Sequence, residues 1–253
     1  MASAERQRHI VELVAAAGEV GIAELAEATG ASEMTIRRDL DVLAERGVVE
    51  RYRGGARTLL RGTEMPYGVR CADRLDVKRR LAEEVAALVA DGESVLIDSG
   101  TTCLEVAKAL NGRRLTVLAL TVHALGALVP TPTLTVLAPG GAVRPGELSF
   151  IGPMACEAIG RLRVDTAVLG CCGLTAADGL TAYDLDEAAV KQAAIASARR
   201  VVVVTESAKL GRTALARVCP PSAIDLVVTE ADAAPAEVAA LTEAGTLVRF
   251  VDG

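Results

Sequence analysis

The chain is poor in aromatic side chains, with two Phe, three Tyr and no Trp among its 253 residues. Hydrophobic residues nevertheless make up 51% of it, so the interior has to be built from Val, Leu, Ile and Ala. Such a composition favours packed helices and buried parallel strands. It argues against an aromatic-rich β-sandwich.

Histidine is also scarce, and the cysteines are scattered. The chain has two His, and its six Cys show no CxxC spacing. Because a zinc site needs several such ligands grouped together, the sequence offers no metal ligand set, and we expect neither metal nor cofactor. Dispersed cysteines are typical of buried thiols in a reducing compartment, which predicts a cytoplasmic protein.

Long apolar runs are missing as well. No uninterrupted stretch reaches the roughly 18 residues that a membrane-spanning helix requires. The first residues, MASAERQRHI, lack the apolar core of a secretory signal peptide. The sequence therefore predicts no membrane partner.

The first 60 residues follow the pattern of a winged helix-turn-helix domain. Apolar residues at helical spacing predict three helices, over 6–17, 22–29 and 33–46. Ser32 is a favourable N-cap for the third helix. Alternating residues then predict the two strands of a wing, over 48–52 and 56–59. This order of elements is that of a DNA-reading module.

The third helix and the wing carry the residues that we expect to contact DNA. A recognition helix reads base edges through its N-terminal residues, while hydroxyl and guanidinium groups also bind phosphates. Segment 37–61 has seven Arg against four acidic residues, a local net charge of +3 in a chain of net charge −6. The predicted DNA contacts are Ser32, Thr35, Arg37, Arg38, Arg51, Arg53 and Arg57. The alternatives are that the module only packs, and that Ser32 is only a helix cap.

The rest of the chain has a different pattern. Residues 61–75 lose periodicity and hold Gly, Pro and several charges, which predicts a linker. From residue 76 onward, predicted helices alternate with continuously apolar strands, which indicates a parallel or mostly parallel, Rossmann-like sheet. The fold class is therefore α/β, with a winged helix-turn-helix domain (1–60), a linker (61–75) and a larger α/β sensing domain (76–253).

The clearest motif of the larger domain comes directly after its first strand, SVLID. It consists of Asp98, Ser99, Gly100, Thr101 and Thr102. Free backbone N–H groups at a helix start, two Thr hydroxyls and a glycine together make an anion cradle. Open α/β sheets also bind their ligands at this end of the strands. The alternative is a helix N-terminus capped by Ser99 or Thr101.

Glycines and charged residues after later strands are further pocket candidates. Gly140 and Gly141 follow one strand, where the alternative is a flexible loop. Glu187 and Lys191 lie one turn apart on a predicted helix, where the alternative is a surface ion pair.

Lysine is rare in this chain, which draws attention to its positions. Only four of the 27 basic residues are Lys. A chain so biased toward Arg keeps Lys where a compact ammonium group matters. Lys78, Lys191 and Lys209 are the predicted pocket lysines, whereas Lys108 is predicted to lie on the exposed surface of a helix.

Both halves of the chain resemble one known family. TIRRDLDVLAERGVVERYRGGA resembles the N-terminal signature of the DeoR family of bacterial repressors. The stretches DSGTT, APGG, LGCCGLTAADGLT, DEAAVK and ESAKLG resemble the sensor domain of that family. That sensor domain is related in fold to ribose-5-phosphate isomerase and glucosamine-6-phosphate deaminase.

The resemblance implies a repressor of carbohydrate metabolism genes that a phosphorylated sugar effector releases from DNA. It also implies that DSGTT holds the phosphate and that Glu187, Lys191 and Lys209 line the pocket. Two positions depart from the family pattern: Arg53 stands where relatives usually carry His, and His123 follows Thr-Val where relatives usually carry Thr-Asn. His123 either faces the ligand or has a structural role.

Two classes of function remain open at this point. A regulator would bind double-stranded operator DNA as a homo-oligomer, at least a dimer, because one recognition helix rarely gives enough specific affinity. A sugar-phosphate isomerase or deaminase fused to a DNA-binding module would use Glu187 as a proton-transferring base. The sequence shows no second acid or base in a catalytic arrangement, so we expect a regulator and no enzyme.

Overall fold

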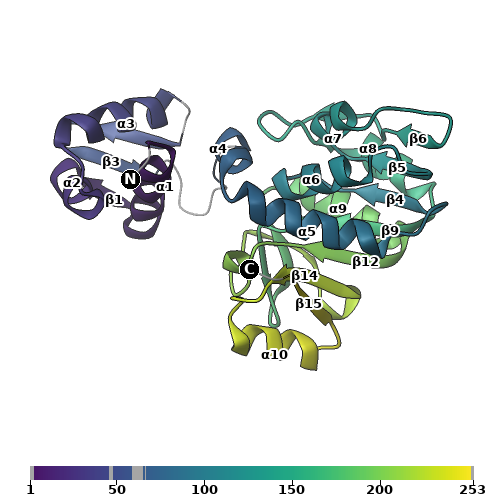
Figure 1. Cartoon of the computed structure of the whole chain (residues 1–253). Helices are drawn as coiled ribbons and strands as arrows, with labels where there is room; N and C mark the ends of the chain where they lie inside the picture. The colour runs from purple at the N-terminus through teal and green to yellow at the C-terminus, as the bar shows by residue number, and fades with distance from the viewer. Residues whose placement is uncertain (1–2, 46–47, 59–64, 66, 252–253) are drawn as a thin grey trace. The chain divides into compact units, whose positions relative to one another are not determined.

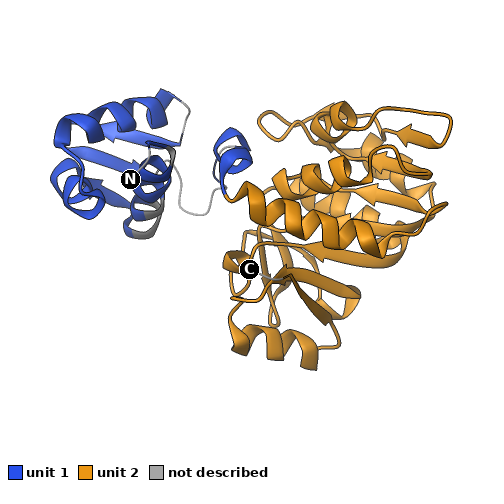
Figure 2. Cartoon of the chain, viewed as in Figure 1, with its two compact units in different colours: residues 1–73 blue, residues 74–253 orange. Residues whose placement is uncertain are grey.

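The computed structural model describes residues 3–45, 48–58, 65 and 67–251. The chain divides into two compact units, residues 1–73 and 74–253 (Figures 1 and 2). This division falls inside the segment that the sequence predicts to be a linker. Part of that segment forms a short helix, α4 (Tyr67–Ala72), and residues 61–64 and 66 lie outside the described residues.

Unit 1 has the predicted winged helix-turn-helix layout. Its helices are α1 (Ser3–Ala17), α2 (Ile22–Thr29), α3 (Glu33–Glu45) and α4. Its antiparallel sheet has the order β1–β3–β2, formed by β1 (Glu19–Gly21), β2 (Val49–Tyr52) and β3 (Gly55–Thr58). The sequence does not predict β1, because three residues are too few to show alternation. The predicted ends of α3 at residue 46 and of the wing at residue 59 lie outside the described residues.

One face of helix α3 packs into the core of unit 1. Ile36, Leu40 and Leu43 are fully buried against the first two helices. Asp39 is buried beside them and accepts hydrogen bonds from Arg6 Nε at 2.6 Å and Gln7 Nε2 at 2.9 Å. Asp39, one of the four acidic residues counted in segment 37–61, therefore lies in the core and not on the exposed face of α3.

Unit 2 is built on a seven-stranded sheet in which every neighbouring pair is parallel. This confirms the predicted parallel α/β fold. In spatial order the strands are β15 (Leu247–Val251), β14 (Leu226–Glu230), β12 (Ala198–Val204), β9 (Val164–Leu169), β4 (Ser94–Ile97), β5 (Leu115–Ala119) and β6 (Leu134–Leu137).

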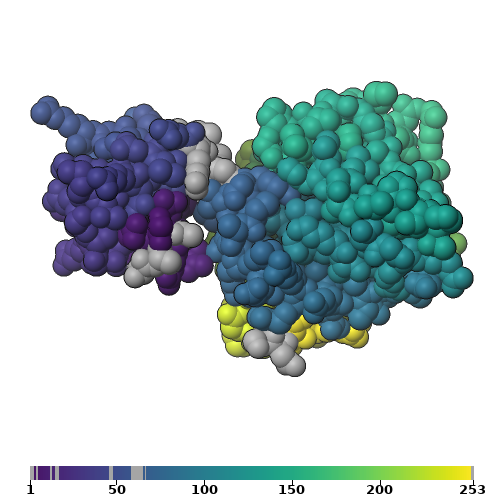
Figure 3. Space-filling view, turned by 45° about the horizontal axis from the view of Figure 1, so that its top comes forward, coloured from purple at the N-terminus to yellow at the C-terminus, as the bar shows by residue number. Residues whose placement is uncertain are grey.

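Helices cover both faces of this sheet, which is why its inner strands are mostly apolar (Figure 1). One face packs against α5 (Leu75–Leu88), α6 (Thr101–Leu110) and α7 (Val122–Ala127). The other packs against α8 (Pro153–Gly160), α9 (Leu185–Ser197) and α10 (Pro235–Glu243). Helices α5 and α6 lie side by side, and their side chains close over one face of the unit in the space-filling view (Figure 3).

Short antiparallel pieces complete unit 2, and the sequence predicts none of them. They are the hairpin of β7 (Ala142–Val143) and β8 (Phe150–Ile151), and a sheet of β10 (Gly173–Thr175), β11 (Gly179–Ala182) and β13 (Ala216–Cys219). Gly173 is required where two segments meet, because a Cβ there would lie 2.3 Å from the Arg212 carbonyl oxygen. The helices in the described ranges include none with the length and hydrophobicity to cross a membrane.

The strand order places a crevice at one point of the sheet. Starting from β4, the sheet continues through β5 and β6 on one side and through β9, β12, β14 and β15 on the other. Connections leave β4 and β9 in opposite directions, which makes their carboxyl ends a switch point of the sheet. Open α/β sheets bind ligands there.

Candidate functional site

Asp98 ties together the two loops at the switch point. It directly follows β4, and its Oδ2 accepts a hydrogen bond from the Gly170 N–H, just after β9, at 3.0 Å. Lys191 Nζ, from α9, pairs with the same carboxylate and donates to the Gly170 carbonyl at 3.0 Å. Three segments far apart in the sequence therefore meet at one buried ion pair.

The partner of Lys191 corrects one alternative from the sequence. The spacing of Glu187 and Lys191 allows a surface ion pair, but both residues are buried and Lys191 pairs with Asp98. Burial disfavours the charge of Lys191, but the adjacent Asp98 carboxylate outweighs that penalty and raises the lysine pKa. The ammonium form of Lys191 is therefore favoured at this site.

Glu187 reaches the same site from the first turn of α9. Asp184 caps this helix by accepting a hydrogen bond from the Glu187 N–H at 3.0 Å. Glu187 Oε1 accepts a hydrogen bond from Ser149 Oγ at 2.7 Å and lies 3.4 Å from Arg144 Nη1. Burial raises the pKa of Glu187, although Lys191, Ser149 and Arg144 act in the opposite direction.

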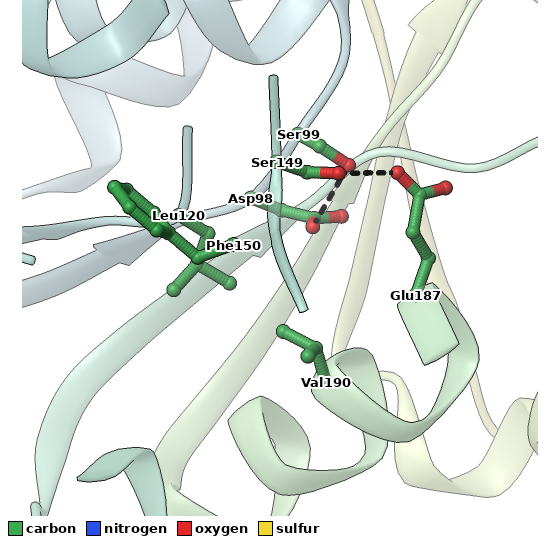
Figure 4. Close-up of a pocket in the computed structure, with 7 residues that line it drawn as sticks. All are labelled: Asp98, Ser99, Leu120, Ser149, Phe150, Glu187 and Val190. Carbon is green, nitrogen blue, oxygen red and sulfur yellow. Dashed lines mark hydrogen bonds between the residues drawn. The ribbon is translucent and has the colours of Figure 1, made fainter. Parts of the chain in front are cut away.

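A small pocket opens between these groups (Figure 4). Polar side chains line one part of it and apolar side chains the other. The lining residues are Asp98, Ser99, Leu120, Ser149, Phe150, Glu187 and Val190. The sequence does not predict Ser149 or Phe150, because they stand at a two-residue strand without any recognisable motif.

The residues of the predicted anion cradle lie at the start of α6. Gly100 is the N-cap with φ of 105°, a conformation that favours glycine, and no side chain caps the helix there. Ser99 Oγ instead lies 3.4 Å from Asp98 Oδ1. The alternative in which Ser99 or Thr101 caps the helix is therefore wrong. Thr101 and Thr102 are buried at its first turn.

Of the predicted pocket residues, only Asp98, Ser99 and Glu187 line this pocket, and Lys191, Gly100, Thr101 and Thr102 are not among its lining residues. Lys209 donates from Nζ to the Cys171 carbonyl at 2.9 Å, which places it against the loop that follows Gly170. Lys78 is 1% exposed, with its Nζ 3.7 Å from Glu206 Oε1.

Gly140 and Gly141 form the turn into β7, with φ of 74° and 99°. A Cβ at Gly141 would lie 2.9 Å from the Ile151 carbonyl oxygen, so this glycine allows the close approach of β8. His123 is half-buried on α7 and does not line the pocket.

The predicted DNA contacts gather on α3 and the wing of unit 1. Ser32 Oγ accepts a hydrogen bond from the Thr35 N–H at 3.2 Å, so the predicted cap is confirmed. Arg38 and Arg53 are exposed. The other predicted arginines are each paired with an acid: Arg37 with Glu33, Arg51 with Asp41 and Arg57 with Glu50.

Among the described residues, no three His, Cys, Asp or Glu side chains are grouped so that they could hold a metal ion. Burial raises the pKa of the Cys103 thiol, which lies near Asp98, and also that of Cys219 to about 11. These thiols are therefore poor metal ligands and poor nucleophiles at neutral pH.

Comparison with known proteins covers both units. Residues 6–60 match the model of the DeoR-like helix-turn-helix domain, and residues 73–231 match that of the DeoR C-terminal sensor domain. The glycerol-3-phosphate regulon repressor of Escherichia coli K12 is 32% identical over 232 residues, 91% of this chain and 92% of its own length. The transcriptional regulator GlpR of Haloferax volcanii is 34% identical over 232 residues, 91% of each chain.

Among solved structures, a ribose 5-phosphate isomerase of Methanocaldococcus jannaschii is 15% identical over 55% of each chain, with a TM-score of 0.40. That likeness is too loose to bear on function. The two matching domains, in this order and over most of the length, show that the chain belongs to the DeoR family of transcriptional regulators.

Proposed function

We propose that this chain represses carbohydrate metabolism genes by binding operator DNA through unit 1, and that a phosphorylated sugar or polyol bound in unit 2 relieves the repression. The observation that carries the proposal is the pocket at the switch point of unit 2, in a chain that also has a helix-turn-helix unit. The bacterial relative named after the glycerol-3-phosphate regulon supports a small phosphorylated effector.

The effector phosphate would bind at the start of α6. The backbone N–H groups there and the hydroxyls of Ser99, Thr101 and Thr102 are suitable phosphate donors, and the ammonium of Lys191 adds positive charge. Glu187 and Ser149, on the opposite wall, would bind the hydroxyl groups of the effector. Asp98 holds Lys191 and the Gly170 loop in place, which keeps the site formed before the ligand arrives.

The remaining candidates have proposed roles around this centre. Lys209 would reach the effector from the loop that contacts Cys171, and Gly140 and Gly141 would shape the far wall. For Lys78 the burial against Glu206 supports an indirect role: it would position the loop that carries Lys209.

Operator DNA would bind to the exposed face of α3 and to the wing. Ser32, Thr35, Arg37 and Arg38 would enter the major groove, where hydroxyl and guanidinium groups read bases and hold phosphates. Arg51, Arg53 and Arg57 would contact the DNA backbone. Because Arg37, Arg51 and Arg57 are paired with acids in the free protein, these contacts would exchange a carboxylate for a phosphate.

The function further implies a homo-oligomer, at least a dimer, acting on DNA in the cytoplasm. We also propose that the chain is not an enzyme. An isomerase or deaminase that used Glu187 as its base would need a second acid or base. Asp98, the other acid of the pocket, is held by Lys191 and Gly170, so it is poorly placed to exchange protons with a substrate. Turnover of ribose 5-phosphate or an amino-sugar phosphate by the purified protein would contradict this.

A thermal-shift screen tests the effector class. A ligand that binds only the folded protein raises its melting temperature by mass action. We expect glycerol 3-phosphate or another phosphorylated sugar to raise it, and the unphosphorylated parent compounds to leave it unchanged. A shift with the unphosphorylated compounds alone would overturn the phosphate cradle.

Thr101→Ala is expected to weaken effector binding and to leave operator binding intact. A hydrogen bond to a charged group contributes about 1.5–3 kcal/mol, so roughly 10- to 100-fold more effector would be needed. The measurement is an effector titration of the operator complex. Thr242→Ala, at an exposed position of α10, is the matched control and should titrate like the parent protein.

Glu187→Gln is expected to flatten the pH dependence of stability in the mildly acidic range. Because the folded pKa of Glu187 is raised, its stabilising effect is complete below the unfolded value of about 4.3 and is lost as the pH rises through the folded value. Gln stays neutral and avoids this loss. Urea unfolding across that range checks it, with Glu243→Gln on α10 as control; identical pH profiles for Glu187→Gln and the parent would refute it.

A further inference from the structure

Helix α3 exposes one large apolar side chain, that of Met34. It is 57% exposed, and in the described part of unit 1 no other large apolar side chain is exposed. The opposite face of α3 is held in the core by Ile36, Leu40 and Leu43. The exposure of Met34 therefore follows from the orientation of a firmly packed helix.

The neighbours of Met34 on this helix are mostly engaged with one another. Ser32 and Thr35 hydroxyls lie 2.9 Å apart, and Arg37 Nη2 lies 3.2 Å from Glu33 Oε2. Asp41, further along, pairs with Arg51 of the wing.

Arg38 is different, because no hydrogen bond or ion pair joins its side chain to another described residue. It lies four residues after Met34, so the two side chains share one face of the helix. A long apolar group and an uncommitted guanidinium thus stand one above the other.

These two groups match two features of the DNA major groove. An apolar side chain contacts the C5-methyl group of thymine, and Arg donates two hydrogen bonds to the O6 and N7 atoms of guanine. A single Met between Arg and hydroxyl side chains is too small an apolar area for a protein interface. The Met34 side chain is the right size to contact one thymine methyl group.

We propose that Met34 and Arg38 act as a reading pair, in which Met34 determines a preference for thymine and Arg38 for guanine. Residues four apart on a helix are separated by about 6 Å along its axis, and stacked bases by about 3.4 Å. Each operator half-site therefore carries a thymine and a guanine about two base pairs apart. This proposal rests on the proposed function, because it requires that unit 1 binds operator DNA.

The test begins with selection of tightly bound duplexes from a random DNA pool by the full-length protein. Each thymine of the selected site is then replaced by uracil, which removes only the C5-methyl group. We expect one replacement in each half-site to weaken binding by roughly three- to fivefold, as for the loss of one buried methyl group. That thymine should lie about two base pairs from a guanine that Arg38→Ala no longer distinguishes from adenine.

Variants at Met34 connect the base to the residue. Met34→Ala should bind the thymine and uracil duplexes equally, whereas Met34→Gln should shift the selected base from thymine toward adenine, because Gln pairs with the adenine edge. Met154→Ala, at a 67% exposed Met of α8, is the matched control and should keep the parent's preference.

The outcomes separate this proposal from the proposed function. If the pool yields a defined site but Met34→Ala retains the parent's ratio of thymine to uracil affinity at every position, the reading pair is wrong and operator binding stands. If no sequence is enriched at all, operator binding by unit 1 is refuted, and the reading pair with it.

Discussion

Lys191→Met destabilises unit 2 by about 3–5 kcal/mol, because removal of one partner leaves the other as an uncompensated buried charge. Asp98 and Lys191 are each only 3% exposed, so water cannot replace the lost ammonium at Asp98. The same change detaches the Gly170 loop from α9. Urea unfolding of the full-length chain, followed by a probe in unit 2, measures the loss.

A double variant shows whether the loss of stability comes from the unpaired charge of Asp98 or from the changed side-chain shape at position 191. The double replacement Asp98→Asn with Lys191→Met removes both charges, and it should recover most of the stability but not the response to the effector. Lys108→Met removes a half-exposed ammonium that pairs with Glu105, but Arg79 Nε remains 3.8 Å from this carboxylate, so the effect on the free energy of unfolding should stay within about 1 kcal/mol. If Lys191→Met were as mild as Lys108→Met, the buried ion pair would not be the centre of the site.

The double variant Arg37→Ala with Arg38→Ala is expected to lose at least about 30-fold in operator affinity, since each arginine contributes roughly 1–3 kcal/mol to DNA binding. If both contact phosphates in addition to bases, the salt dependence also becomes shallower, by close to one unit of slope for each lost phosphate contact. Fluorescence anisotropy with labelled operator at several salt concentrations measures both quantities.

Two arginines of unit 2 provide the control. Arg161 and Arg163 are exposed and two residues apart, and their replacement by Ala removes the same charge from the chain. Operator affinity should then stay within about twofold of the parent. Normal operator binding by the Arg37, Arg38 double variant would show that α3 is not the recognition helix. A matching loss in the control would show that total charge, rather than position, controls binding.

Long, strongly apolar elements of this chain could be predicted from the sequence. Helix α2 over 22–29 and strand β9 over 164–169 have the predicted bounds, because one buried apolar face defines the helix and a mostly apolar segment defines the strand. The hairpin of β7 and β8 could not be predicted, because two-residue strands are held by tertiary contacts and show no periodicity of their own.

The site was harder to predict than the fold. The sequence places Asp98 and the Thr101–Thr102 pair at the end of a strand, and the switch point in the sheet explains why that strand end is open. The partner of Lys191 is 93 residues away in the chain, whereas Glu187 is one turn away, so local spacing favours the wrong pair. Ser149 was missed since only the folded hairpin brings its hydroxyl to Glu187.

Relief of repression requires that effector binding in unit 2 changes DNA binding by unit 1, and one titration tests this most directly. Operator affinity of the full-length protein is measured with and without glycerol 3-phosphate and a panel of phosphorylated sugars, beside their unphosphorylated parents. An effector changes DNA affinity only if it binds the two DNA-binding states unequally. We expect one phosphorylated compound to lower operator affinity by roughly 5- to 150-fold, while its parent compound has no effect. Unchanged affinity across the whole panel would contradict it.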